Sequence, residues 1–146
     1  MLTRCLVLAL VLVTTSTVTA QQTPLRGNID IPAQNAVVSR AGLYLAGWEF
    51  DCQTGQQPYG VSAFYTTDTG IVPVPVVVKW RVYRPDVYQA FAGFSCDQNG
   101  SLYLSPFTGW HLYFPEPPPV GQRTLILQFS TSAGISYRQV SVDLRD

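Results

Sequence analysis

Two carboxylates spaced two residues apart are the first candidates for chemistry in this chain. Glu49 and Asp51 alternate with the apolar side chains between Trp48 and Cys52, and the period of two in a strand places both carboxylates on one face. Such a pair performs general acid and base catalysis when burial raises one pKa, which would make the protein a small carboxylate-dependent hydrolase. We favour the plainer interpretation, in which they are two solvated charges on an outer sheet face.

The single histidine and the other metal-binding residue types follow no recognisable site pattern. His111 lies between Trp110 and Leu112, so on a strand its ring points away from the core, and no Ser or Cys nucleophile is spaced to use it. Zinc takes about four closely spaced ligands and calcium about six or more oxygens, and the sequence pattern supplies neither set. We therefore expect a protein that is not an enzyme, with no metal and no cofactor.

Arg84 and Asp86 flank Pro85 and allow two interpretations. A functional one makes them a clamp for a charged ligand. The structural one is a fixed turn with an ion pair, in which Asp86 caps a single helical turn that ends at Phe91. We favour the structural interpretation.

Aromatic residues provide the candidate contact surfaces, with 8 Tyr, 7 Phe and 3 Trp in the chain. The three tryptophans have apolar neighbours on their strands, so we expect core packing rather than stacking on sugar rings. Tyrosine tolerates a half-solvated contact, which makes the exposed tyrosines better candidates for binding an extracellular protein or a glycan. These candidates are Tyr83, Tyr88, Tyr103 and Tyr113.

The charge balance argues against a nucleic-acid partner. The chain has 9 Lys and Arg against 9 Asp and Glu, and loss of Arg4 with the leader described below leaves 8 − 9 = −1. Charged residues make up 12% of the chain, compared with about 25% in an ordinary soluble domain. Nucleic-acid binding depends on basic surface, so none is expected.

The N-terminus has the layout of a secretory signal peptide over residues 1–20. Arg4 provides the positive charge, Cys5–Val13 is an unbroken apolar run, and small residues lead to Ala20. The run is shorter than the about 20 residues that span a bilayer, so we expect no membrane span after cleavage; an uncleaved anchor is the alternative. Cys5 is at the start of the apolar run and not at the cleavage point, which disfavours lipid attachment. The predicted location is secreted or periplasmic.

Two cysteines remain after cleavage, Cys52 and Cys96. An even number in an exported chain predicts a disulfide, with two buried thiols as the alternative. The bridge would close a loop of about 44 residues and contribute roughly 4 kcal/mol in the chain-entropy model.

The elements that must position these residues are short strands separated by turns. Residues 21–26 are expected to form a flexible tail and residues 27–146 a single domain. The clearest alternation is Val76–Tyr83, in which Val76, Val78 and Trp80 share the core face. About seven or eight strands with almost no helix predict an all-β, immunoglobulin-like two-sheet β-sandwich, with a small closed barrel as the alternative. The Cys and Trp order of antibody domains is absent.

Several segments also share a pattern with a known family. They are Asn28–Pro32 with Val37–Ser39, Gly47–Asp51 (G-W-x-x-D), Arg84–Val87 (R-P-D-V), Gly109–Trp110, Gly121–Leu125 and Thr131–Gly134. Together they resemble the bacterial immunoglobulin-like domains of exported proteins. The stretch 53–75 is longer and richer in Pro and Gly than that pattern, and Gln122–Arg123 replace other polar residues. The resemblance implies a structural or ligand-presenting module without catalytic residues.

Overall fold

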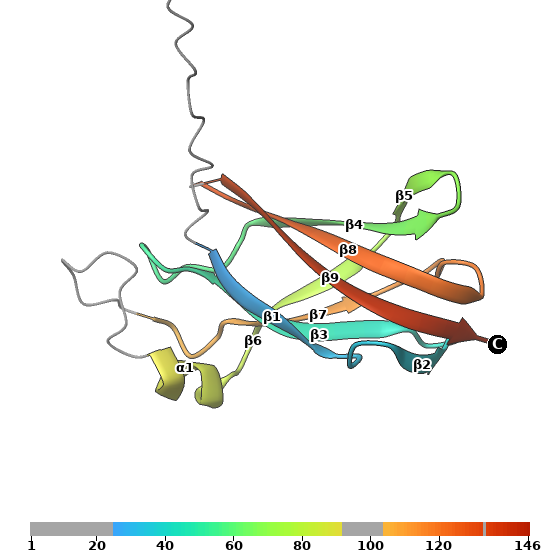
Figure 1. The fold of residues 1–146 in the computed structure, drawn as a ribbon. Coiled ribbons are helices and arrows are strands. Elements are labelled where there is room, and N and C mark those ends of the chain that lie inside the picture. The colour runs from blue at the N-terminus through green and yellow to red at the C-terminus, as the bar shows by residue number, and fades with distance from the viewer. Residues whose placement is uncertain (1–24, 92–103, 133) are drawn as a thin grey trace, which may run out of the picture.

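The computed structural model describes residues 25–91, 104–132 and 134–146. These residues form nine strands and one short helix, stacked as two sheets (Figure 1). The elements are β1 (Leu25–Ile31), β2 (Ala36–Ser39), β3 (Tyr44–Asp51), β4 (Gly60–Thr67), β5 (Gly70–Val74), β6 (Val77–Val82), α1 (Pro85–Phe91), β7 (Gly109–Tyr113), β8 (Gly121–Thr131) and β9 (Gly134–Arg145).

The strand order confirms the predicted two-sheet β-sandwich and excludes the small closed barrel. The four-stranded sheet has the order β1-β3-β7-β6, and the five-stranded sheet has the order β2-β9-β8-β4-β5. Only β2 and β9 pair in parallel among the described strands. These orders correspond to the ABED sheet and the extended GFC sheet of an immunoglobulin-like sandwich.

The main core lies between the two sheets. It consists of inward side chains from both layers, with fully buried members Leu45, Trp110, Leu112, Leu125, Leu127, Phe129 and Leu144. Val76, Val78 and Trp80 pack against it, as their alternation predicted. Gly47 is required where β3 passes β1, because a Cβ there would lie 2.1 Å from the Asn28 carbonyl oxygen and 2.6 Å from Trp110 Cζ2.

A second apolar cluster covers the outer face of the four-stranded sheet. Phe50, Cys52, Val87 and Leu104 are buried together, with Trp48 and Phe91 packed against them. Figure 1 shows α1 on the side of this sheet that faces away from β8 and β9. The end of β3 is therefore buried on both faces. Cys96, the predicted disulfide partner of Cys52, lies outside the described residues, so the bridge stays a prediction.

Three boundaries differ from the sequence expectation. Leu25 and Arg26, assigned to the flexible tail, already belong to β1 and pair with β3. The segment Gly70–Val74 forms β5, a strand that the turn at Asp68–Gly70 does not predict; Pro73, which suits the entry to a strand or an edge, lies on an edge strand and needs no ladder partner on its free side. The strand expected at Leu102–Leu104 falls largely outside the described residues. The signal peptide, residues 1–20, also lies outside them.

Candidate ligand-binding groove

A ligand-sized groove opens between the loop that joins β3 to β4, the end of β6 and the segment that leads into β7. Its volume is about 570 Å³, and small-molecule sites typically enclose about 300–1,000 Å³. Its lining residues are Thr54–Tyr59, Trp80, Arg81, Ser105 and Phe107. Three sequence-distant segments thus meet at one depression of the surface.

Aromatic side chains form the apolar part of the groove. Trp80 is half-buried and packs edge-on against the core ring of Phe129, with 6.3 Å between ring centroids. Tyr59 is 75% exposed and Phe107 is 42% exposed. Phe107 also contacts Tyr83, at 5.4 Å between centroids. A rigid indole beside two exposed rings is an arrangement suited to a ligand with an apolar face.

Gln57 fixes the polar part of the groove. Its side-chain Oε1 accepts a hydrogen bond from the Arg81 backbone N–H at 3.0 Å, and its Nε2 donates to the Gly109 carbonyl at 2.8 Å. Arg81 lies in a bulge of β6 and its backbone φ is 61°. This left-handed conformation is seldom adopted by residues other than glycine. One amide side chain therefore ties the loop to two strands and holds the strained backbone of Arg81 in place.

Asp51 builds the loop from which Tyr59 projects. Its Oδ1 accepts the Gln53 N–H at 2.8 Å, its carbonyl accepts the Gly55 N–H at 2.6 Å, and its N–H donates to the Gln56 carbonyl at 2.8 Å. The Tyr59 N–H then donates to β8 at 3.0 Å. Asp51 is buried, so the expectation of a solvated carboxylate on an outer face is wrong: its oxygens serve the turn.

The same expectation is wrong for Glu49, which points between the sheets and has no exposed surface. Its Oε1 accepts hydrogen bonds from Arg138 Nη2 at 2.8 Å and Ser136 Oγ at 3.1 Å, both on β9. The carboxylate lies above Gly27, where a Cβ would come within 1.7 Å of Oε2. The face was misassigned because α1 covers the other side of β3, leaving the carboxylates on the inner side.

Burial raises the pKa of Glu49 to about 7, because desolvation of the carboxylate outweighs the opposing effects of the Arg138 charge and the hydrogen bonds from Ser136 and Arg138. Its Oε2 has no hydrogen-bond partner among the described residues, and neither has the buried Thr108 Oγ1 on the paired strand segment. A buried carboxyl of this kind gains or loses a proton near neutral pH.

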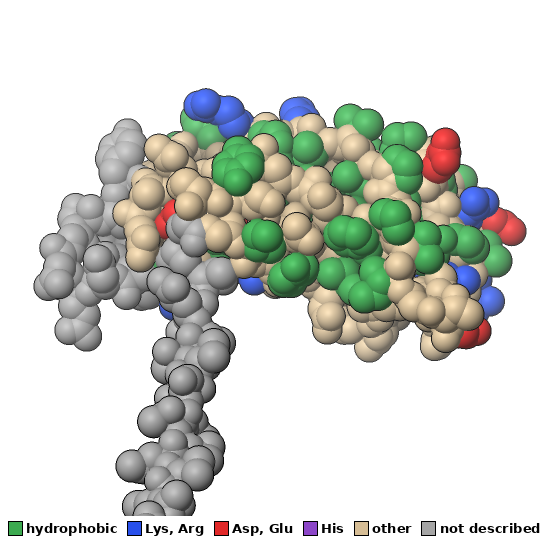
Figure 2. Space-filling view, turned by 90° about the horizontal axis from the view of Figure 1, so that it is seen from above, with side chains coloured by type: hydrophobic (Ala, Val, Ile, Leu, Met, Phe, Trp, Pro, Cys, Tyr) green, Lys and Arg blue, Asp and Glu red, His purple; other side chains and the backbone are tan. Residues whose placement is uncertain are grey.

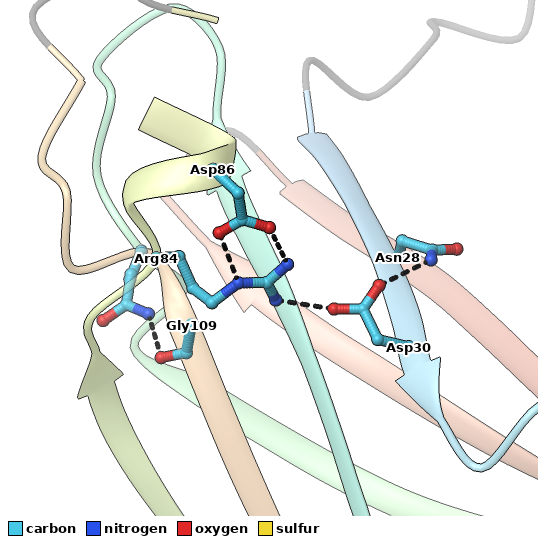
Figure 3. Close-up of polar contacts among 6 residues, drawn as sticks. Asn28, Asp30, Arg84, Asp86 and Gly109 are labelled. Carbon is cyan, nitrogen blue, oxygen red and sulfur yellow. Dashed lines mark hydrogen bonds and ion pairs between the residues drawn. The ribbon is translucent and has the colours of Figure 1, made fainter. Parts of the chain in front are cut away.

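Arg84 joins helix α1 to strand β1 (Figure 3). Its Nε and Nη2 donate to the two carboxylate oxygens of Asp86 at 2.9 and 2.6 Å, and its Nη1 donates to Asp30 Oδ2 at 2.6 Å. The hydrogen bonds from Arg84 lower the pKa of Asp86 to about 2. Because every guanidinium nitrogen already donates to a carboxylate of the protein itself, this is the ion-paired turn favoured from the sequence and not a ligand clamp.

The tyrosines expected to bind a ligand are dispersed over the surface. Tyr83 is exposed beside the groove, whereas Tyr88 is exposed on α1. Tyr103 lies outside the described residues. Tyr113 packs with Tyr44 on the outer face of the four-stranded sheet, and the half-buried ring of His111 contacts both. Among the three candidates that the structure describes, Tyr83 is the one recorded in contact with a groove-lining residue, Phe107.

The groove residues themselves were missed in the sequence. The Gly and Pro content of the stretch 53–60 predicts a loop and no more, and the period-two pattern predicts Arg81 on the solvent face of a regular strand. The available signal was the run from Gln56 to Tyr59, in which two amides and an aromatic ring occupy a loop stiffened by Pro58. The bulge at Arg81 has no such signal, because arginine is not a residue that favours positive φ.

The face of the five-stranded sheet carries few charges. Viewed from this side, apolar and uncharged side chains cover most of the surface, and charged side chains gather along its margin (Figure 2). Exposed apolar members include Ile71, Ile135 and Tyr137. The described surface has other depressions of similar volume, including one of about 520 Å³ along β4 and β5, and the groove beside Trp80 differs from it in being lined by three aromatic residues.

Fold and groove together define the class of this protein: an all-β, two-sheet sandwich of immunoglobulin-like strand order with a ligand-sized groove. No protein-family model matches the chain, and no curated protein matches it in sequence. Within the described ranges, no group of three or more His, Cys, Asp or Glu side chains is placed to hold a metal ion. The helix in this part of the chain is too short and polar to cross a membrane.

Proposed function

We propose that this protein is an exported, non-catalytic sandwich module that binds carbohydrate in the groove beside Trp80. The observation that carries the proposal is the combination of a half-buried indole with the exposed rings of Tyr59 and Phe107 in one concave surface. Flat aromatic faces stack on the apolar faces of sugar rings. The predicted signal peptide and the resemblance to immunoglobulin-like domains of exported proteins support the placement outside the cell.

The polar lining also fits a sugar. Amide and hydroxyl groups from Thr54, Gln56 and Ser105 line the groove beside the aromatic rings. Such groups both donate and accept hydrogen bonds, which is the requirement for recognising sugar hydroxyls. The loop that carries them joins β3 to β4, and by analogy alone the corresponding loop of antibody variable domains also contacts ligand.

The alternative functions receive less support. A hydrolase using Glu49 and Asp51 requires both carboxylates to reach substrate, but Glu49 has no exposed surface and Asp51 is committed to its turn. A subunit that pairs through a sheet edge requires a long open strand. Of the four edge strands, β2 has four residues, β5 contains Pro73 and β6 is bulged at Arg81. The fourth, β1, has seven residues and its pairing is irregular between Ile29 and Ile31.

Screening on a printed glycan array, followed by calorimetric titration, tests the proposal. The secreted protein should bind at least one oligosaccharide, and Tyr59→Ala should weaken that binding about tenfold through loss of the stacking surface. Tyr137→Ala is the matched control, because Tyr137 is 61% exposed on the five-stranded sheet, away from the groove. Absence of binding to every glycan, or equal losses in the two variants, would overturn the proposal.

A further inference from the structure

Arg81 gives the groove a chemical preference beyond carbohydrate in general. It is the one charged side chain among the described residues that line the groove, and no Asp or Glu accompanies it. Three other arginines, Arg84, Arg138 and Arg145, are engaged in ion pairs with carboxylates of the protein. No such pair joins Arg81 to the described residues, and its side chain is exposed. Within the described part of the chain, its charge therefore has no carboxylate partner.

The backbone conformation of Arg81 indicates that its side chain is held in the groove by specific interactions. A left-handed φ of 61° costs free energy in a residue with a side chain, and the Gln57 hydrogen bond to the Arg81 N–H opposes relaxation of the bulge. The bulge breaks the pairing of β6 with β7 between Lys79 and Val82. A β-bulge re-aims the side chain it carries, and here that side chain lines the groove next to Trp80.

We propose that the ligand is an acidic glycan whose anionic group, a uronic-acid carboxylate or a sulfate ester, is held by the Arg81 guanidinium while a neighbouring sugar ring stacks on the aromatic rings. This inference rests on the proposed carbohydrate function and names the substrate class of the same groove. The planar guanidinium makes paired, charge-assisted hydrogen bonds to either group, which a neutral sugar cannot accept with equal strength. The uncharged remainder of the lining leaves no repulsion against an anion.

The test compares matched pairs of oligosaccharides that differ only in charge. We would print galacturonate and glucuronate oligosaccharides beside their methyl esters, and sulfated oligosaccharides beside their unsulfated forms, and titrate the strongest binder in solution. The wild-type protein should bind the charged member at least tenfold more tightly than the neutral one. Arg81→Gln should abolish this preference, Arg81→Lys should keep part of it, and Lys79→Gln, an exposed cation on the same strand, should leave it intact.

The outcomes separate the two proposals. Equal binding of charged and neutral partners, unchanged in Arg81→Gln, would overturn the acidic-glycan inference and leave carbohydrate binding standing. A preference for charged glycans that survives in Arg81→Gln would overturn the assignment to Arg81. Binding to no glycan of either kind would overturn both proposals. Circular dichroism and thermal melting of each variant establish that the fold is retained before binding is compared.

Discussion

Glu49→Gln changes how the stability of this protein depends on pH. The carboxyl is fully buried and its pKa is raised from 4.5 to about 7, chiefly by desolvation. A difference of this size between the folded and unfolded states corresponds to about 3 kcal/mol of unfolding free energy. Glutamine keeps the shape and the hydrogen-bonding ability of the protonated carboxyl but has no proton to lose.

The sign follows from proton binding. Between about pH 4.5 and 7 the folded state keeps the proton on Glu49 while the unfolded chain releases it, so unfolding becomes easier as the pH rises. The stabilisation is complete below pH 4.5 and is lost once the pH has passed through about 7. Relative to the wild-type protein, Glu49→Gln should therefore gain about 3 kcal/mol between pH 4.5 and 8.5. Other titrating groups cancel in this difference.

Urea denaturation of both proteins at half-unit steps from pH 4.5 to 8.5 measures the difference directly. Glu116→Gln serves as the control, because it makes the same substitution at an exposed position in the proline-rich segment. The difference between Glu49→Gln and wild type should change across this range, whereas parallel curves would refute the reasoning. A loss of stability in Glu49→Gln that is equal at every pH would report only the uncompensated charge of Arg138, whose partner it removes.

Two further predictions concern packing and covalent structure. Gly47→Ala should destabilise the protein by about 2–3 kcal/mol, because its Cβ would lie 2.1 Å from a backbone oxygen of β1. Gly60→Ala is the control, because nothing lies within 4 Å of its new Cβ, and its free energy of unfolding in urea should change little. Intact-mass spectrometry of the secreted protein should show a chain that starts at Gln21, with Cys52 and Cys96 alkylated only after reduction; retention of residues 1–20 or thiols that react in the native sample would contradict the export interpretation.

The sequence predicts the parts of this fold in which one sheet face is buried and the other is solvated. The Val76–Trp80 stretch is such a case, because β6 is an edge strand with one face on the core. The alternation predicts the wrong environment for Glu49 and Asp51, because both faces of that part of β3 are buried. Alternation alone does not show which face of the strand packs against the opposite sheet. The covering helix was anticipated as one turn, but its position over Trp48 and Phe50 depends on long-range packing.

The groove was not predictable for a related reason. Its residues come from three segments whose proximity depends on the strand order, and its charged residue depends on a bulge. Period-two reasoning places Arg81 on the solvent face of a regular strand. The true position follows from the hydrogen bond between Gln57 and the Arg81 N–H, which joins residues separated by 24 positions in the chain.

Three positions in this chain show how structural and functional requirements can be separated. Gly47 is explained by packing alone, because the close approach of β1 and Trp110 leaves no room for a Cβ. Arg84 is explained in the same way by its two carboxylate partners. Arg81 has a strained backbone and a charge without a partner in the described residues, and neither feature stabilises the sandwich. The proposed ligand would explain why a costly conformation places a charge with no partner among the described residues in a groove lined by aromatic rings, and this is why binding at Arg81 is the first property to measure.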